Sequence, residues 1–340
     1  MAGIRGRITV IAEVIEALHH GGEKSGNEVL HRTEPFYHGG LIEDVPIVSG
    51  NSFKHLNREG AAMFALAALG LLPEEDEEGK LGNAELNLLI SGGTLTKSGQ
   101  SIRLDEARKA ELALPVLGLH GYACGNVMQE AQAVFSNLTL ACDSTAHLTE
   151  EVIERLAPAY RSRLEDTPDD FLESYFGTNH EPTRRRAMRD LLYVEDRKAI
   201  EKQVSDDKDA GVADRGRKST QMIYSYQCLV PGSVLVGSIT LKNGLRHREL
   251  QALRSGFWWP SEGQGPNGGI LLRLGGKGSV GRGLVEMRFF GELAEGLQAP
   301  RMVGTQEIAP VAGLDDEALQ TYAEGLKSAG AMEALKELLK

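Results

Sequence analysis

A glycine-rich segment near the C-terminal end sets the strongest constraint on the fold of this chain. Residues 276–281 read GKGSVG and match the G-x-G-x-x-G pattern of dinucleotide-binding loops. Such a loop needs a helix directly after it, because the pyrophosphate binds at the helix N-terminus. From Val285 to Phe289, however, apolar and charged residues alternate, which is the period of a strand. The sequence therefore predicts a strand, a glycine loop and a second strand over 270–290, and it disfavours a Rossmann site. The glycine loop is either a binding loop or a plain hairpin turn.

The rest of the chain interleaves strand and helix patterns. Alternation over 7–15 predicts a half-buried strand, and the polar segment 19–43 predicts a long loop. The helix over 53–72 has Asn51 or Ser52 as its expected N-cap. Further strands are predicted over 134–142, 222–230 and 233–241, and further helices over 101–112, 149–176, 245–255 and 315–340, the last broken at Gly330. The predicted class is α+β, an antiparallel sheet with helices on one face.

Composition excludes several classes of protein. The three cysteines are widely spaced and form neither a disulfide framework nor a zinc knuckle. No apolar run is long enough to span a bilayer, and Glu13 and Glu16 interrupt the first apolar stretch, so we expect a cytoplasmic protein with no membrane partner. Lys and Arg number 37 and Asp and Glu 48, a net charge of −11. This disfavours nucleic-acid binding at face value, but the placement of the basic residues decides the matter.

Basic residues gather in three places. The first is the predicted helix start after Ser49. Helix N–H groups attract anions at this end, so the presence of cationic side chains here is better explained by an external phosphate. The second is the glycine loop, and the third is the highly charged segment 184–218, which we interpret as a projecting arm. For the helix start, the alternative is ordinary capping. For the glycine loop it is a plain hairpin turn, and for the segment 184–218 it is a solvated surface. The candidate RNA-binding residues are Asn51, Ser52, Lys54, His55, Arg58, Arg184, Arg185, Arg186, Arg189, Arg215, Arg217, Lys218, Gly276, Lys277, Gly278, Ser279 and Arg282.

No catalytic or metal-binding motif is present. His19, His20, His31 and His38 fall in one segment, but no thiolate or carboxylate completes a known metal-ligand spacing. Glu34, Glu43 and Asp44 are possible acids or bases that nothing in the sequence pairs. We therefore expect no metal, no cofactor and no catalytic residue.

Five short motifs resemble, in order, those of the CRISPR-associated RAMP superfamily. They are LHHGG at 18–22, VPIVSGNSFK at 45–54, LGLHG at 117–121 with FSNLTLACD at 135–143, LVPGSVL at 229–235, and LGGKGSVGRG at 274–283. Together they cover most of the chain and are most similar to the seventh Cas family. The second motif departs from the family pattern, with Ser49 in place of a proline and His55 in place of a glycine.

The resemblance implies a modified ferredoxin-like (RRM-like) palm with finger and thumb insertions. The chain would form a single domain over 1–340. Its palm core would comprise about 4–22, 45–72, 117–145, 222–245 and 268–292, with helical insertions at 72–116 and 146–180, a thumb-like basic insertion at 184–222 and C-terminal helices at 314–340.

The resemblance also implies a function in antiviral or antiplasmid defence. Members of this family stack helically along a CRISPR guide RNA, with other effector subunits as partners and a target nucleic acid paired to the guide. Type III members cleave target RNA with an Asp in the first long loop, and Thr33 holds that position here. We therefore expect a non-enzymatic subunit of type IV. The alternatives are a metal-dependent RNA nuclease using Glu34 or Glu43, and a nucleotide-binding enzyme that would need a helix after Gly283.

Overall fold

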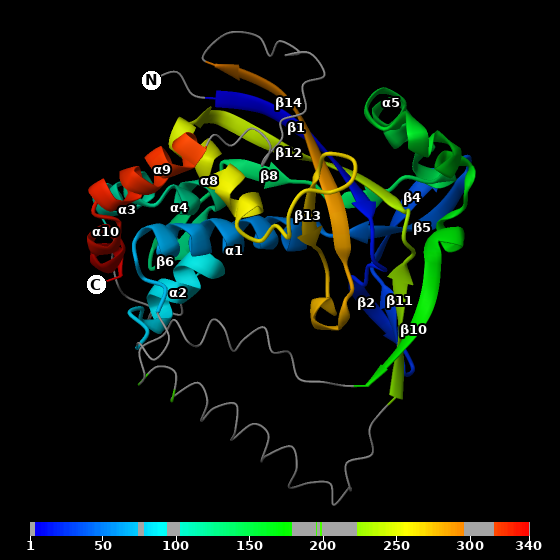
Figure 1. Ribbon diagram of the computed structural model, residues 1–340, viewed down its shortest axis with the longest axis horizontal. Coiled ribbons are helices and arrows are strands. Elements are labelled where there is room, and N and C mark those ends of the chain that lie inside the picture. Colours follow the sequence, from blue (N-terminus) through cyan, green and yellow to red (C-terminus); the bar gives the residue numbers. More distant parts are fainter. Residues whose placement is uncertain are drawn as a thin grey trace, which may run out of the picture.

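The computed structural model describes residues 4–73, 78–93, 103–178, 195, 198, 223–295 and 316–339. Within them the largest sheet has eight strands, every pair antiparallel, in the order β13-β14-β1-β12-β9-β5-β4, with β8 also paired to β12 (Figure 1). These strands are β1 (Ile4–Val14), β4 (Thr33–His38), β5 (Leu41–Val48), β8 (Ala133–Phe135), β9 (Leu138–Leu140), β12 (Val234–Leu245), β13 (Ile270–Arg273) and β14 (Leu284–Glu295). The predicted α+β class with an antiparallel sheet is confirmed.

Two helices cover one face of this sheet. α1 (Gly50–Ala68) and α8 (His247–Trp258) pack closely because glycines meet at their crossing: a Cβ on Gly60 would lie 2.2 Å from the carbonyl oxygen of Gly256. The apolar residues on the same side of β1, among them Val10 and Ala12, are fully buried beneath them. The helical layer continues through α2 (Asn83–Ile90), α3 (Leu104–Ala113), α4 (Pro115–His120), α9 (Asp316–Ser328) and α10 (Ala331–Leu338) (Figure 1).

The opposite face of the sheet also carries helical structure. α5 (Ala146–Leu156) and the 3-10 segment η2 (Pro158–Glu165) lie there, and the short 3-10 segment η3 (Pro168–Phe171) follows them in the chain. Ile11, whose side chain points away from those of Val10 and Ala12, is fully buried in a separate cluster with Ile153 and Val234. The prediction of helices on one face only is therefore wrong, because β1 presents apolar residues to both sides at this end.

A second sheet has the order β10-β11-β3-β2 and contains one parallel pair, β11 with β3. Its strands are β2 (Gly21–Ser25), β3 (Glu28–His31), β10 (Leu172–Thr178) and β11 (Ile223–Leu229), and β6 (Tyr122–Cys124) forms a separate hairpin with β7 (Val127–Gln129). The predicted loop over 19–43 is thus wrong, since it forms β2, β3, β4 and the start of β5. The helix predicted to continue to 176 also ends early, because β10 pairs along β11.

Most other local predictions are confirmed, with shifted boundaries. Residues 270–290 form a strand, a loop and a strand, and the C-terminal helix pair breaks at Gly330, which has a φ of +61°. The strand predicted over 134–142 is split into β8 and β9. The N-cap of α1 is Ser49 rather than Asn51 or Ser52. In the part of the chain that the structure describes, none of the helices has the length and apolar character needed to cross a membrane.

Candidate nucleic-acid interface

The glycine loop between β13 and β14 is held by backbone contacts that only glycine permits. Gly275 and Gly283 have φ angles of +70° and +81°, and a Cβ on either residue would lie about 2 Å from a backbone oxygen, that of His19 or Leu274. The N–H groups of Gly276 and Gly283 donate to the carbonyl oxygens of His19 and Ala17, at 2.7 and 3.0 Å. The loop therefore lies in a fixed position against residues 17–19, as a binding loop requires.

Lys277 is placed in this loop with an unusual backbone conformation. Its φ of +70° is the one positive φ of a non-glycine residue among the described positions. A side chain in the left-handed region costs roughly 1–2 kcal/mol, and such strain concentrates at functional sites. Its Nζ lies 5.3 Å from the centre of the Tyr226 ring, and partial burial lowers the pKa of the lysine. Lys277 is therefore a partly desolvated cation near the loop surface.

Arg282 and two tyrosines complete this arrangement. The Arg282 guanidinium carbon lies 4.1 Å from the centre of the Tyr175 ring, within the range of cation–π attraction. The rings of Tyr175 and Tyr226 stack with centres 6.2 Å apart, and His19 packs edge-on against Tyr226 at 5.1 Å. These rings come from β10, β11 and the segment that follows β1, and they hold both loop cations in place. We call Lys277, Arg282, Tyr175 and Tyr226 the cation–tyrosine cluster.

The sequence predicted the two cations of this cluster but not its aromatic residues. Tyr175 lies in a segment predicted to be helical, and Tyr226 is separated from the glycine loop by about fifty residues of sequence. The Tyr-x-Tyr alternation at 224–226 indicates a strand, yet nothing local shows that this strand runs beside the loop. Gly276, Gly278 and Ser279 lie on the same loop at or near its surface, as predicted.

The start of α1 differs from the predicted phosphate site. The N–H of Gly50 donates to Asn137 Oδ1 at 2.7 Å, and the N–H of Ser52 donates to Ser49 Oγ at 3.3 Å. Asn137 in turn donates from Nδ2 to Glu34 Oε1 at 2.7 Å. Protein groups therefore already satisfy these N–H groups, so the prediction that an external phosphate occupies this helix end loses its main support. The side chains of Asn51 and Ser52 remain exposed and half-buried, respectively.

Arg58 has a structural position rather than a surface one. The residue is 5% exposed, and its Nε, Nη1 and Nη2 donate to the carbonyl oxygens of Leu89, Gly121 and Leu88 at 2.7–2.8 Å. Burial lowers the pKa of its guanidinium to about 10. Two of the acceptors belong to the last turn of α2, so Arg58 closes that helix. Its assignment to RNA binding is therefore wrong for this conformation.

Lys54 and His55 remain at or near the surface of α1. Lys54 is half-buried, and its pKa is lowered first by burial and then by the positive charges of Arg58 and Lys242. No carboxylate forms an ion pair with Lys54 in the described part of the chain. His55 is exposed and lies 3.4 Å from Glu59 in an i, i+4 pair. Lys54 is thus a cation that an external anion would stabilise, because like charges surround it.

Two adjacent histidines connect α1 to the glycine loop. His19 accepts the N–H of Gly276 through its carbonyl oxygen, and the Nε2 of His20 accepts the N–H of Ser49, the N-cap of α1, at 3.1 Å. Both histidines are buried. The two candidate surfaces are therefore connected through two adjacent residues, by the backbone of His19 and the side chain of His20.

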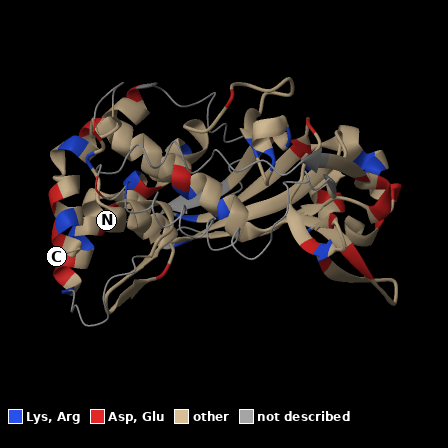
Figure 2. Ribbon diagram, turned by 90° about the horizontal axis from the view of Figure 1, so that it is seen from below, with Lys and Arg blue, Asp and Glu red and all other residues tan. Residues whose placement is uncertain are grey.

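Seven of the predicted basic residues lie outside the described part of the chain. They are Arg184, Arg185, Arg186, Arg189, Arg215, Arg217 and Lys218, and most of the predicted thumb over 184–222 lies there too. Their assignment stays a prediction. In the described ribbon, basic and acidic residues are both present towards each of its ends (Figure 2).

The acidic residues of the nuclease alternative are engaged with neighbours. Glu34 accepts from Asn137, and Glu43 accepts from the hydroxyl of Ser144. The described residues contain no group of three or more His, Cys, Asp or Glu side chains arranged to hold a metal ion. The nucleotide-enzyme alternative needs a helix after Gly283, and β14 begins at Leu284 instead. The structure therefore lacks the helix on which that alternative depends.

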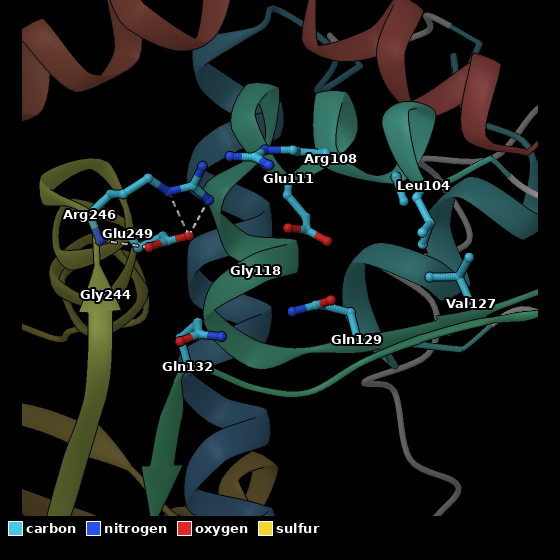
Figure 3. Close-up of a pocket in the computed structure, with 11 residues that line it drawn as sticks. Leu104, Arg108, Glu111, Gly118, Val127, Gln129, Gln132, Gly244, Arg246 and Glu249 are labelled. Atoms are coloured by element: carbon cyan, nitrogen blue, oxygen red, sulfur yellow. Dashed lines mark hydrogen bonds and ion pairs between the residues drawn. The ribbon is translucent and has the colours of Figure 1, made fainter. Parts of the chain in front are cut away.

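A polar pocket of about 470 Å³ lies apart from the loop, between α3, α4 and α8 (Figure 3). Arg246 and Glu249 form an ion pair on one wall, and Glu249 Oε2 also accepts the Arg246 N–H at 2.7 Å. Glu111 points into the pocket from α3 and accepts from Tyr122 Oη at 3.1 Å, and burial raises the pKa of its carboxyl group. The ion pair caps α8, so this part of the pocket stabilises the helix. No sequence motif indicates this pocket.

Comparisons with known proteins find similar structures only. No family model and no curated protein matches the chain. One similar solved structure is a type IV-B CRISPR complex, with a TM-score of 0.48 and 14% identity, covering 90% of this chain and 97% of that chain. Another is the crystal structure of Thermofilum pendens Csc2, with a TM-score of 0.37 and 11% identity, covering 99% of this chain and 80% of that chain.

Proposed function

We propose that this chain is an RNA-binding backbone subunit of a type IV-like CRISPR effector ribonucleoprotein. The observation that carries the proposal is the cation–tyrosine cluster on the fixed glycine loop. Cations held over aromatic rings, beside exposed glycine backbone, are suited to phosphate oxygens, and phosphate contacts supply most of the affinity of such proteins. The loop coincides with the last of the five RAMP-like motifs, at 274–283.

The topology of the central strands supports a ferredoxin-like palm. Along the chain, β1, α1, β9, β12, α8 and β14 follow one another as strand, helix, strand, strand, helix, strand, with further elements inserted between them. In the sheet their order is β14-β1-β12-β9. This succession is that of the ferredoxin-like β-α-β-β-α-β motif, which RNA-recognition domains also use.

In this proposal the protein positions the guide and does not read its sequence. Lys277 and Arg282 contact guide phosphates, and Lys54 contributes a third cation from α1. Base pairing between the guide and its target then carries the sequence specificity, as in other RNA-guided systems. Further copies of the chain and other effector subunits bind along the same RNA, and the chain itself has no catalytic role. The basic segment 184–222 would act as the thumb.

Co-purification tests this proposal. The chain is expressed with its neighbouring operon partners and a CRISPR transcript, purified by size exclusion, and its ratio of absorbance at the nucleic-acid and protein maxima is measured. We expect a large particle that contains RNA of uniform length protected from ribonuclease. A monomer free of nucleic acid under these conditions would contradict the proposal.

A further inference from the structure

The sheet face that carries α5 is only partly covered by that helix. α5 packs over the end of the strands where Ile11 and Val234 are buried. Further along the same face, Thr9 of β1 lies opposite Ser238 of β12 in the antiparallel register. Between this exposed part of the sheet and α5 lies a groove of about 650 Å³. The groove is on the side of the sheet opposite α1 and α8.

Hydroxyl groups form the floor of this groove. Thr9, Thr139 and Ser238 line it, and their hydroxyls make no hydrogen bond within the described part of the chain. Ser238 is only 6% exposed, so few water molecules reach it compared with a surface serine. Hydroxyl groups in such a position gain from a ligand that offers hydrogen-bonding oxygens.

Two arginines line the groove beside these hydroxyls. Arg7 extends from β1 and is exposed, and Arg155 extends from α5. Glu151 is the one acidic residue among the described residues that line the groove. The lining therefore carries a net positive charge, in a protein whose total charge is −11.

One residue joins the groove to the start of α1. Asn137 lines the groove, and its Oδ1 accepts the N–H of Gly50 at 2.7 Å. Asn137 therefore connects the lining of the groove to the first residue of α1.

We propose that this groove binds a stretch of single-stranded nucleic acid through its sugar–phosphate backbone, in addition to the stretch bound at the glycine loop. The proposal rests on the proposed RNA-binding function. Hydroxyls together with arginines are the usual partners of phosphate and sugar oxygens. No aromatic side chain lines the groove among the described residues, so base stacking is not part of the contact. Recognition is therefore independent of base sequence.

The test uses the full chain freed of nucleic acid and a fluorescent single-stranded oligouridine. The groove variant is Arg7→Gln with Arg155→Gln, and the matched control is Arg161→Gln, an exposed arginine outside the groove that pairs with Glu154. We expect the groove variant to bind the RNA more weakly, with a salt dependence whose slope is smaller by about 0.7 for each arginine removed. Ser238→Ala should also weaken binding, and the control should bind like the unmodified chain.

A loop variant, Lys277→Glu, separates failure of the groove from failure of the proposed function. If Lys277→Glu weakens binding but the groove variant and Ser238→Ala do not, the groove proposal is overturned and the proposed function stands. If the unmodified chain binds no RNA, both are overturned. Protection of Arg7 from an arginine-modifying reagent by RNA, but not by inorganic phosphate, supports the groove as a strand site. Equal protection by phosphate alone would assign it to a small anion and overturn the proposal.

Discussion

The backbone N–H of Ser49 donates to Nε2 of His20 at 3.1 Å, so this ring nitrogen must be an acceptor and the imidazole must be neutral. The backbone N–H of His20 donates in the same way to Nδ1 of His31, at 3.4 Å. Protonating either ring would replace an acceptor by a donor facing an N–H group. These buried histidines therefore connect the N-cap of α1 to β3 only in their neutral forms.

The first prediction is a loss of stability in mild acid. Burial, then the nearby charges of Arg32 and His19, lowers the pKa of His20 to about 4, and burial with His20 and His19 lowers that of His31 to about 3. In the unfolded chain both would titrate near 6.5. The unfolded state therefore binds more protons below pH 6.5, and the free energy of unfolding falls as the pH decreases from 6.5 towards 4. For His20 alone the loss is about 3 kcal/mol.

Denaturant titrations between pH 7 and 4 measure this effect. The variant His20→Gln keeps an acceptor for Ser49 but cannot titrate, and it should lose stability less steeply than the unmodified chain. His147→Gln, an exposed histidine, is the control and should follow the unmodified chain. Identical slopes for His20→Gln and the unmodified chain would show that His20 does not contribute.

The second prediction concerns Arg58. Arg58→Ala leaves the carbonyl oxygens of Leu88, Leu89 and Gly121 without their donors. The free energy of unfolding should fall by about 3 kcal/mol or more, and Arg58→Lys should recover little of it, because an ammonium group lacks the planar fork of donors. Thermal unfolding measures the change. RNA affinity per folded molecule should stay the same, and a stable variant with weakened RNA binding would restore Arg58 to the interface.

The third prediction separates two glycines of the loop that share a φ of +70°. Gly275→Ala meets the His19 carbonyl oxygen at 2.2 Å, whereas Gly281→Ala meets no atom within 4 Å. We expect Gly281→Ala to cost only the conformational strain, roughly 1–2 kcal/mol. Gly275→Ala should cost more and should also weaken RNA binding, because the loop must move away from residues 17–19. Equal losses of unfolding free energy in calorimetry would show that the loop does not need the close approach of Gly275 to the carbonyl oxygen of His19.

The fourth prediction is the absence of target cleavage. The chain, loaded with guide, is incubated with complementary labelled RNA and Mg²⁺ or Mn²⁺. We expect the target to remain intact, since Thr33 provides no carboxylate and Glu34 and Glu43 are bonded to Asn137 and Ser144. Cleavage that is lost in Glu34→Gln or Glu43→Gln would favour the nuclease alternative.

Local patterns predicted those elements whose own residues carry the signal. The alternation in β1 and β14 and the break at Gly330 were predictable, because period and turn residues lie within one short window. β10 was missed, because it is a strand only through pairing with β11, far away in sequence. β3 was missed although it pairs with the neighbouring β2, because its other partner, β11, is also distant in sequence. Arg58 was misassigned for a similar reason: its three acceptors lie about 30 to 63 residues away in the sequence.

The residues of the candidate site also divide into those with a local sequence signal and those placed by contacts that are distant in sequence. Lys277 and Arg282 could be predicted from their own loop, whereas Tyr175 and Tyr226 join it only through the second sheet. The cap of α1 at Ser49 likewise depends on His20 and Asn137, which no local rule connects to it.

RNA binding by the double variant Lys277→Glu with Arg282→Glu is the sharpest test of the proposed function. The double variant is compared with Lys109→Glu, an exposed lysine on α3, by titration with fluorescent single-stranded RNA at several salt concentrations. We predict that the double variant stays folded and binds RNA more weakly, with a salt slope smaller by about 0.7 for each phosphate that is no longer bound. The control should bind like the unmodified chain. A folded double variant with unchanged affinity and slope would contradict the role of the cation–tyrosine cluster in RNA binding.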